Sequence, residues 1–238
     1  MLSSQVTDFY SLTEIRPQHI PPWHSWRMAG RPRATGESAG VRDSRQDLLD
    51  AAAELFIAHG FAATSTRAIA DRAGLRQASL YHYFSGKEEI LTVLLSGTVR
   101  PSLQAGRTLH GMPGSASAKL WALCQLDLEL LCGGRYNLGV LYLRPEIQAP
   151  TFTDFHTERA SLRALYRSMV LAAGADETSA DLVFGLVEGV ILTRQWKEIP
   201  DVTAYASAGA DAGVQIACPH ADLVVVRTEA LALMAKVD

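Results

Sequence analysis

Side chains that hydrogen-bond well to nucleic acid gather in one short stretch of this chain, between Thr64 and Lys87. Apolar spacing in this stretch predicts two short helices joined by a tight turn at Gly74, a pattern typical of a helix-turn-helix. The second helix would turn its apolar residues toward the protein and leave its outer side to Gln77, Ala78, Ser79, Tyr81 and His82. Amide, hydroxyl and aromatic groups of this kind suit base edges and phosphates, so the sequence predicts a DNA-binding surface.

Other helices must hold the helix-turn-helix in place, and the sequence predicts helices both before and after it in the chain. A first helix starts near Asp43 and ends at His59-Gly60, and its apolar residues recur at helical spacing. We expect further helices at 88–106, 116–132, 136–143, 153–174, 176–197 and 219–236, with loops at 111–114, 133–134, 145–150 and 200–218. No segment alternates with a period of two. The predicted fold is therefore all-α, with an N-terminal three-helix helix-turn-helix domain and a helical C-terminal domain.

The composition bounds the class of protein. Hydrophobic residues make up 48% of the 238 residues, enough for a substantial core. No run of about 18 uninterrupted apolar residues and no apolar signal segment occurs, so we expect a soluble, cytoplasmic protein. The three cysteines lack CxxC spacing, which argues against a disulfide framework or a zinc site. The prediction includes no metal and no cofactor.

Charge is distributed unevenly along the chain. Residues 1–87 carry a formal charge of +2 and residues 88–238 a charge of −5. A mildly basic N-terminal part on an acidic remainder fits a DNA-binding head on a body that phosphates would repel. We accordingly divide the chain into an N-terminal extension and basic arm (1–41), a helix-turn-helix domain (42–87) and a helical domain (88–238).

The first 41 residues contain four helix-breaking prolines, and we expect no packed structure before about residue 42. Two interpretations of residues 1–27 remain open: an upstream extension of an over-long gene model that truly starts at Met28, or a genuine disordered tail. Arg31 and Arg33 either form an arm that enters the minor groove or belong to a solvated tail.

Residues 45–91 resemble the DNA-binding domain of the TetR family. The matching segments are Ala-Glu-Leu-Phe-Ile-Ala-His-Gly-Phe, then Thr-Ser-Thr-Arg-Ala-Ile-Ala-Asp-Arg-Ala-Gly-Leu, then Ala-Ser-Leu-Tyr-His-Tyr-Phe-Ser-Gly-Lys-Glu-Glu-Ile-Leu. The register holds without a gap. The resemblance implies a dimeric transcriptional regulator, with no enzymatic activity, that binds palindromic operator DNA and a small effector. Repression is the usual mode of the family.

The resemblance also implies roles for single residues. Thr66, Arg67 and Tyr81 would contact phosphates, Gln77 and Ser79 would face bases, and His82 would reach either. Lys87 would add its charge to a helix N-terminus that faces phosphate. Arg76 departs from the pattern, because the family usually has a Ser or Thr cap there. It either weakens the capping of the recognition helix or supplies a cation for phosphate or guanine.

The C-terminal domain has two predicted functions. The helix at 116–132 is apolar nearly all round and therefore central. We expect an effector, an apolar or aromatic molecule, in a cavity lined by Trp121, Cys124, Leu128, Tyr142, Phe155 and Phe184, although plain core packing is the competing interpretation of each residue. Glycines spaced i, i+4 and a second apolar stripe predict a homodimer interface at Gly185, Gly189, Leu223, Val226 and Ala230, with packing inside one chain as the alternative.

Two other function classes compete with a regulator. An enzyme is disfavoured, because the sequence contains no GxSxG, HExxH, Walker A or GxGxxG pattern. A TetR-like protein that has lost DNA binding would be an interaction module, and its recognition face would be acidic or eroded. The polar residues on the outer side of the second helix of the helix-turn-helix, which follows Gly74, argue against that alternative.

Overall fold

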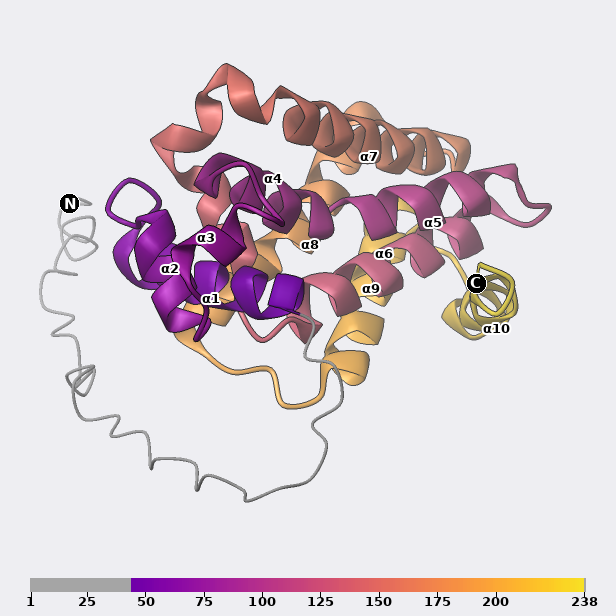
Figure 1. The fold of residues 1–238 in the computed structure, drawn as a ribbon. Coiled ribbons are helices and arrows are strands. Elements are labelled where there is room, and N and C mark those ends of the chain that lie inside the picture. The colour runs from indigo at the N-terminus through magenta and orange to yellow at the C-terminus, as the bar shows by residue number, and fades with distance from the viewer. Residues whose placement is uncertain (1–43, 238) are drawn as a thin grey trace, which may run out of the picture. The chain divides into compact units, whose positions relative to one another are not determined.

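Helices make up the regular structure of residues 44–237, the part of the chain that the computed structural model describes (Figure 1). No strand occurs in this range, which confirms the all-α prediction. The elements are α1 (Ser44–His59), α2 (Thr66–Arg72), α3 (Gln77–Leu80), α4 (Lys87–Gly97), α5 (Arg100–Gly111), α6 (Ala116–Gly133), the short 3-10 helices η2 (Leu138–Leu143), η3 (Pro145–Gln148) and η4 (Pro150–Phe152), then α7 (Thr153–Ala172), α8 (Glu177–Trp196), α9 (Val202–Ala217) and α10 (Leu223–Met234). The extension and arm predicted for residues 1–41 lie outside the described residues.

Helices α1, α2 and α3 form the head of the molecule. The Ser65 hydroxyl accepts a hydrogen bond from the Ala68 amide at 3.1 Å and caps the start of α2. Gly74 follows α2 with φ of +72°, a left-handed conformation that glycine adopts without penalty. Ile69, Leu80 and other apolar residues from all three helices are fully buried, so each short helix is stabilised by the others.

The helix predicted at 88–106 is in fact two helices. α4 ends at Gly97 and α5 begins at Arg100, with Pro101 in its first turn. Proline has no amide hydrogen to donate to the preceding turn, and its ring clashes with that turn, so one helix cannot run through this position. The Thr98 hydroxyl donates to the Leu95 carbonyl at 2.6 Å and satisfies one of the carbonyls that the end of α4 leaves open.

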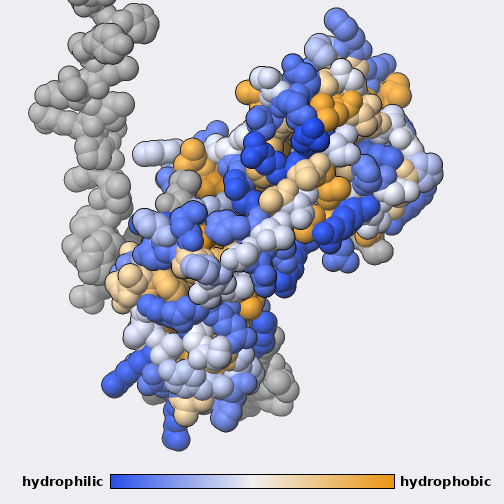
Figure 2. Space-filling view, turned by 90° about the horizontal axis from the view of Figure 1, so that it is seen from above, coloured by the Kyte–Doolittle hydropathy of each residue, from blue (hydrophilic) through white to orange (hydrophobic). Residues whose placement is uncertain are grey.

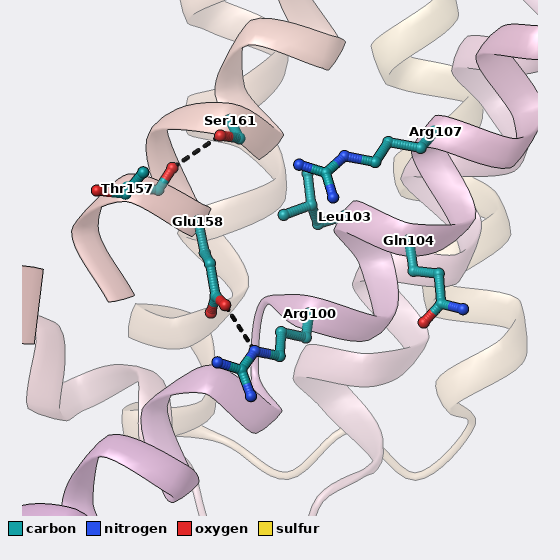
Figure 3. A pocket seen from close by; sticks show the side chains of 7 residues that line it. All are labelled: Arg100, Leu103, Gln104, Arg107, Thr157, Glu158 and Ser161. Atoms are coloured by element: carbon teal, nitrogen blue, oxygen red, sulfur yellow. Dashed lines mark hydrogen bonds and ion pairs between the residues drawn. The ribbon is translucent and has the colours of Figure 1, made fainter. Parts of the chain in front are cut away.

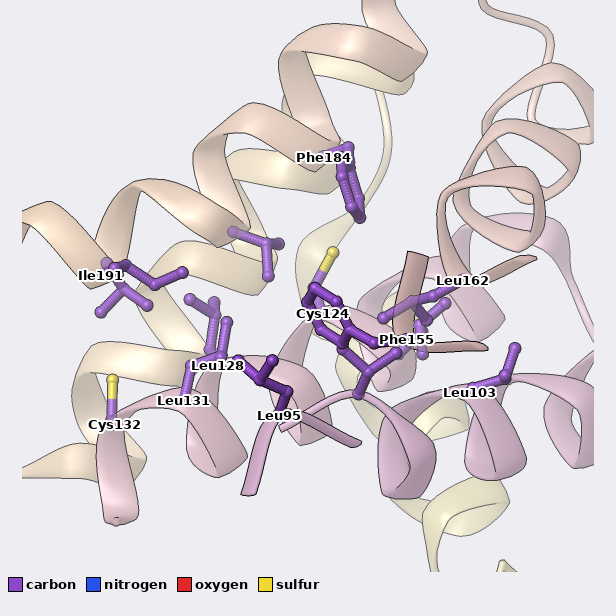
Figure 4. Close-up of a cluster of buried hydrophobic side chains, with 14 of the residues drawn as sticks. Leu95, Leu103, Cys124, Leu128, Leu131, Cys132, Phe155, Leu162, Phe184 and Ile191 are labelled. Carbon is purple, nitrogen blue, oxygen red and sulfur yellow. The ribbon is translucent and has the colours of Figure 1, made fainter. Parts of the chain in front are cut away.

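Helix α6 is the centre of the body, which we define as α5 to α10. Helices α5, α7, α8, α9 and α10 all pack against it. Figure 4 shows side chains of α6, such as Leu128 and Leu131, in one cluster with Leu95 of α4, Phe155 of α7 and others. The apolar character of α6 on nearly every side explains this enclosed position.

Helix α9 occupies a segment, 200–218, that the sequence predicted to be a loop. The segment is rich in alanine and glycine and has few large apolar residues to mark a helical face. Alanine nevertheless favours helix, and the Asp201 carboxylate caps α9 by accepting from the Ala204 amide at 2.9 Å. The small residues allow α9 to approach α6 closely: a Cβ added to Gly209 would lie 2.5 Å from Cδ1 of Leu128.

The connection between α6 and α7 also differs from its prediction. The helix expected at 136–143 is the 3-10 helix η2, and the loop expected at 145–150 contains η3 and begins η4. Pro145 and Pro150 each stand in the first turn of one of these short helices. Proline is tolerated there, because the first amides of a helix have no partner within it.

Exposed large hydrophobic side chains of the described residues belong to the end of α3 and to α8 and α10. The face drawn in Figure 2 carries hydrophobic residues in small patches among hydrophilic ones. Scattered apolar residues are normal on a protein surface, whereas a continuous stripe calls for an explanation.

The close contact between α9 and α6 gives a test of the fold. Gly209→Ala should lower the free energy of unfolding by about 1–3 kcal/mol, because the new methyl group overlaps the buried side chain of Leu128. Urea unfolding measures this change. Gly97→Ala is the matched control, since its Cβ would meet nothing within 4 Å. Equal stability of the two variants would contradict the close packing of α9.

Candidate DNA-binding surface and its connection to the body

Three of the predicted DNA-binding residues meet on the outer side of the head. The Tyr81 hydroxyl lies 3.2 Å from Oγ1 of Thr66, and the Gln77 amide donates to the same Oγ1 at 3.1 Å. Tyr81 is 52% exposed, so its ring and hydroxyl face solvent while this contact orients them. The start of α2 and the recognition helix α3 therefore present one hydrogen-bonded cluster, which we call the Thr66–Gln77–Tyr81 cluster.

The other predicted contacts surround this cluster. Arg67 and His82 are exposed and Ser79 is half-buried. Arg67 lies 3.8 Å from Asp71, but both side chains are largely exposed, so this ion pair holds the guanidinium only weakly. Arg76 is the N-cap residue of α3 and makes no side-chain cap, which leaves its exposed guanidinium on the surface of the head.

Lys87 is turned inward rather than toward solvent. Its ammonium donates to the carbonyls of Phe61 and Thr64, each at 2.9 Å, and of Ala62 at 3.3 Å. It also lies 4.5 Å from the centre of the Phe61 ring. All three donors of the ammonium are thus directed at the turn before α2. A direct contact of Lys87 with phosphate would require these hydrogen bonds to be exchanged.

A hollow of about 500 Å³ lies between the starts of α2 and α4, lined by residues 62–66 and 85–88 together with Tyr81. Amide groups at helix starts carry partial positive charge and favour anions. Tyr83 is 43% exposed beside the buried Phe84. Its ring therefore adds to the exposed surface of the head.

The head is joined to the body by polar contacts that the sequence analysis missed. Arg72 of α2 donates to the Glu54 carboxylate through Nε at 3.0 Å and Nη2 at 2.6 Å. The Tyr136 hydroxyl, from the loop after α6, donates to the same carboxylate at 3.3 Å. The Asn137 amide donates to the Ile191 carbonyl of α8 at 2.8 Å. Loop 134–137 therefore contacts both the head and α8. Residues so far apart in sequence carry no local signal of such contacts.

The six residues predicted to line an effector cavity lie inside the body. Trp121, Cys124, Leu128, Phe155 and Phe184 are buried, and Tyr142 is half-buried with its ring 5.1 Å from that of Phe155. Figure 4 shows four of these residues in the core cluster. The Trp121 indole donates to Asp211 of α9 at 2.8 Å, and Asp211 also pairs with Arg227 of α10. Trp121 is thereby tied to the α9 and α10 side of α6.

Other residues line two cavities, one at the junction of the head and the body and one within the body. One, of about 280 Å³, lies where α1, α4, α6, η2 and α8 meet, and its walls include Leu49, Leu94 and Leu130. The other, of about 350 Å³, lies between α5 and α7 (Figure 3). Cavities of this size lie near the lower end of the range that takes small molecules.

A carboxyl group is buried within the body on α6. Asp127 is 2% exposed, and the Tyr166 hydroxyl donates to its Oδ2 at 2.9 Å. Burial raises the pKa of Asp127 to about 6, because the charged form loses its hydration. Asp127 is therefore an interior residue with a hydrogen-bond partner.

The residues predicted for the dimer interface separate into two groups. A Cβ on Gly185 or Gly189 of α8 would meet nothing within 4 Å, so this face is open. On α10, Val226 and Ala230 are 7% and 0% exposed, and Leu223 is half-buried. Because α10 packs on α6, Val226 and Ala230 are used inside the protomer and are not available to a second copy. Packing inside one chain is the alternative that the sequence left open for these residues.

Residues 44–237 contain neither a membrane-spanning helix nor a metal-binding group. Within that range, no helix is long and apolar enough to cross a membrane. Nor does that part of the chain bring together three or more His, Cys, Asp or Glu side chains in a group suited to a metal ion.

The fold and the polar surface of the head define a helix-turn-helix DNA-binding protein, and comparisons with known proteins agree. The family model described as "Bacterial regulatory proteins, tetR family" matches residues 48–94. The HTH-type transcriptional repressor KstR2 of Rhodococcus jostii (strain RHA1) is 29% identical over 151 residues, which cover 62% of this chain and 73% of that protein. The uncharacterized HTH-type transcriptional regulator YvkB of Bacillus subtilis (strain 168) is 34% identical over 162 residues, covering 65% of this chain and 84% of YvkB.

A solved structure extends the likeness to the body. The crystal structure of AmtR from Mycobacterium smegmatis superposes with a TM-score of 0.75 and 39% identity, over 86% of this chain and 98% of AmtR. The chain belongs to the TetR family of transcriptional regulators. It is a DNA-binding regulator and not an enzyme.

The inward position of Lys87 gives a test of its role. Lys87→Met should lower the free energy of unfolding by about 1–3 kcal/mol, because the carbonyls before α2 lose a charged donor. Urea unfolding measures the change, and Lys197→Met, at an exposed lysine of the body, is the control. If Lys87 served only to contact phosphate, Lys87→Met would leave the stability unchanged. It would then reduce the slope of log affinity against log salt concentration by about one unit per head.

Proposed function

We propose that this chain is a ligand-responsive repressor that binds a palindromic operator as a homodimer and is released by a small effector. The observation that carries the proposal is the Thr66–Gln77–Tyr81 cluster. It places an exposed aromatic hydroxyl and an amide side by side on the outer face of a helix-turn-helix. Groups of this kind contact phosphates and read base edges in the major groove.

Arg67, Arg76, Ser79 and His82 extend this surface around the cluster. In the proposal Gln77 and Ser79 face bases, and the two arginines and Tyr81 contact phosphates. Several phosphate contacts from each head would make the logarithm of affinity fall steeply with the logarithm of salt concentration. The relative KstR2 is named a repressor, which supports repression as the mode of action here.

The exposed face of α8 supports a homodimer. Leu182, Leu192 and Trp196 are 58%, 50% and 84% exposed, and Gly185 and Gly189 stand between them. These five positions are spaced alternately by three and four residues, the spacing of a seam between two packed helices. Glycines in such a seam allow backbones to approach. A symmetric pair of heads could then bind two half-sites about 34–36 Å apart.

The position of α4 supports a response to an effector. α4 packs against α1 of the head and against α7 and η2 beyond it. We place an apolar or aromatic effector in the body, beside Trp121, Phe155 and Phe184. An effector that favours another tilt of α4 would change the separation of the two recognition helices. Effector and operator must then weaken each other's binding by the same factor.

The cluster predicts the effect of removing a single oxygen atom. Tyr81→Phe should weaken binding to an operator obtained by selection from random DNA by about tenfold, since a hydrogen bond to phosphate and the contact with Thr66 are lost while the ring stays. Gel shift measures this affinity. Tyr205→Phe, at a half-buried tyrosine of α9, is the matched control. An unchanged affinity in the folded Tyr81→Phe protein would refute this assignment of the surface.

The α8 seam predicts the effect of a charge on assembly. Leu192→Glu should convert the dimer to a monomer in sedimentation equilibrium, because a carboxylate would be buried without a partner between two copies. Leu231→Glu, on the equally exposed face of α10, should leave the dimer intact. If instead the dimer were lost only on substitution of Leu231, the interface would lie on α10 and not on α8.

A further inference from the structure

The hollow between α5 and α7 has a chemical character that neither DNA binding nor dimerisation explains. It measures about 350 Å³ and lies in the body (Figure 3). Arg100, Leu103, Gln104 and Arg107 line it from α5, and Thr157, Glu158 and Ser161 line it from α7. None of these residues belongs to the head or to the α8 seam.

The α5 wall presents hydrogen-bond donors. Arg100, Gln104 and Arg107 follow one another at i, i+4 and i+7, so they share one face of the helix. Figure 3 shows the Arg107 guanidinium reaching from α5 toward α7. Among the described residues, none accepts a hydrogen bond from Arg107. Arg100 uses only its Nε on Glu158, at 2.6 Å, which leaves its terminal nitrogens to donate.

The α7 wall presents acceptors. The Thr157 hydroxyl donates to the Thr153 carbonyl at 2.9 Å, and the Ser161 hydroxyl donates to the Thr157 carbonyl at 2.8 Å. Their hydrogens are thus engaged within α7, and their oxygens remain as acceptors. Oε2 of Glu158 is buried and has no hydrogen-bond partner among the described residues. A buried acceptor without a donor is costly, and a ligand donor would remove that cost.

The charge of the hollow opposes that of its surroundings. Two guanidinium groups face one carboxylate, which leaves one positive charge in excess. The chain from residue 88 onward carries a formal charge of −5. Other arginines of α7 are matched by carboxylates: Arg163 pairs with Asp181 and Arg167 with Glu177. The hollow is therefore a local attraction for an anion in an acidic body.

We propose that this hollow binds a small hydroxylated anion. Its carboxylate or phosphate group would accept hydrogen bonds from Arg107 and from the free nitrogens of Arg100, a geometry that guanidinium groups favour. Its hydroxyl groups would donate to Oε2 of Glu158 and to the hydroxyl oxygens of α7. Leu103, 5% exposed, closes the floor of the site. The site requires neither operator binding nor a dimer, so it can be tested apart from both.

The experiment titrates the full chain with three probes: inorganic phosphate, glycerol 3-phosphate and glycerate. The ¹H–¹⁵N signals of the arginine Nε–Hε groups report where each probe binds. We expect the Arg100 and Arg107 signals to shift and glycerol 3-phosphate to bind more tightly than inorganic phosphate, because it adds hydroxyl donors. Comparison with glycerate shows whether the site favours a phosphate or a carboxylate. The proposal would be overturned if the Nε–Hε signals of Arg100 and Arg107 did not shift with any of the three probes at the highest concentration used.

Two substitutions should change affinity in opposite directions. Arg107→Gln should weaken binding by about tenfold, through the loss of a charge-assisted hydrogen bond. Glu158→Gln should tighten the binding of inorganic phosphate several-fold, because a repelling carboxylate is removed, and should reduce the preference for glycerol 3-phosphate, because the charged acceptor for its hydroxyl groups is lost. If these residues had a purely structural role, the two substitutions would not change the affinity for the anion in opposite directions. Arg163→Gln on α7 is the matched control and should leave affinity unchanged. Loss of binding in Arg76→Gln but not in Arg107→Gln would place the anion on the DNA-binding surface and refute the site.

Discussion

A helix that is apolar on nearly every side has no face to offer to water, and other helices must enclose it. α6 is such a helix, and the arrangement of the body follows from the need to cover it. α5, α7, α8, α9 and α10 each take one part of its circumference. Coverage by α9 depends on residues without side chains, since Gly209 and Gly213 lie directly over Leu128 and Cys124. The identity of a few small residues therefore decides whether the core closes.

The short helices of the head would not be stable alone, so they pack on one another through buried apolar residues, and polar contacts join them to the rest of the chain. Lys87 ties the first turn of α4 to the carbonyls that precede α2. Glu54 joins Arg72 of the head to Tyr136 of the body through one carboxylate. Because of these contacts, a movement of α4 or of loop 134–137 would be transmitted to α1 and α2, and through their packing to the recognition helix.

The helix-turn-helix could be predicted from sequence because its signals are local: caps, a left-handed glycine and closely spaced apolar residues. α9 could not, because its buried face consists mainly of alanine and glycine, which give only a weak apolar periodicity, and its packing partner on α6 is about eighty residues away. The same limit applies to Lys87, whose charge suggested phosphate while its neighbours from residues 61–64 direct it inward. The α8 glycines were recognised by spacing, but only burial shows that Val226 and Ala230 of α10 face inward.

The carboxyl group buried on α6 links proton uptake to folding. An aspartate in an unfolded chain loses its proton near pH 4, whereas Asp127 in the folded body keeps it up to about pH 6. Between these values the folded chain holds a proton that the unfolded chain has released. The contribution of Asp127 to the free energy of unfolding is therefore greatest below pH 4. It declines as the pH rises through 6 and stays low above that. Once Asp127 loses this proton, a negative charge lies in the interior of the body, and the hydrogen bond from the Tyr166 hydroxyl offsets part of its cost.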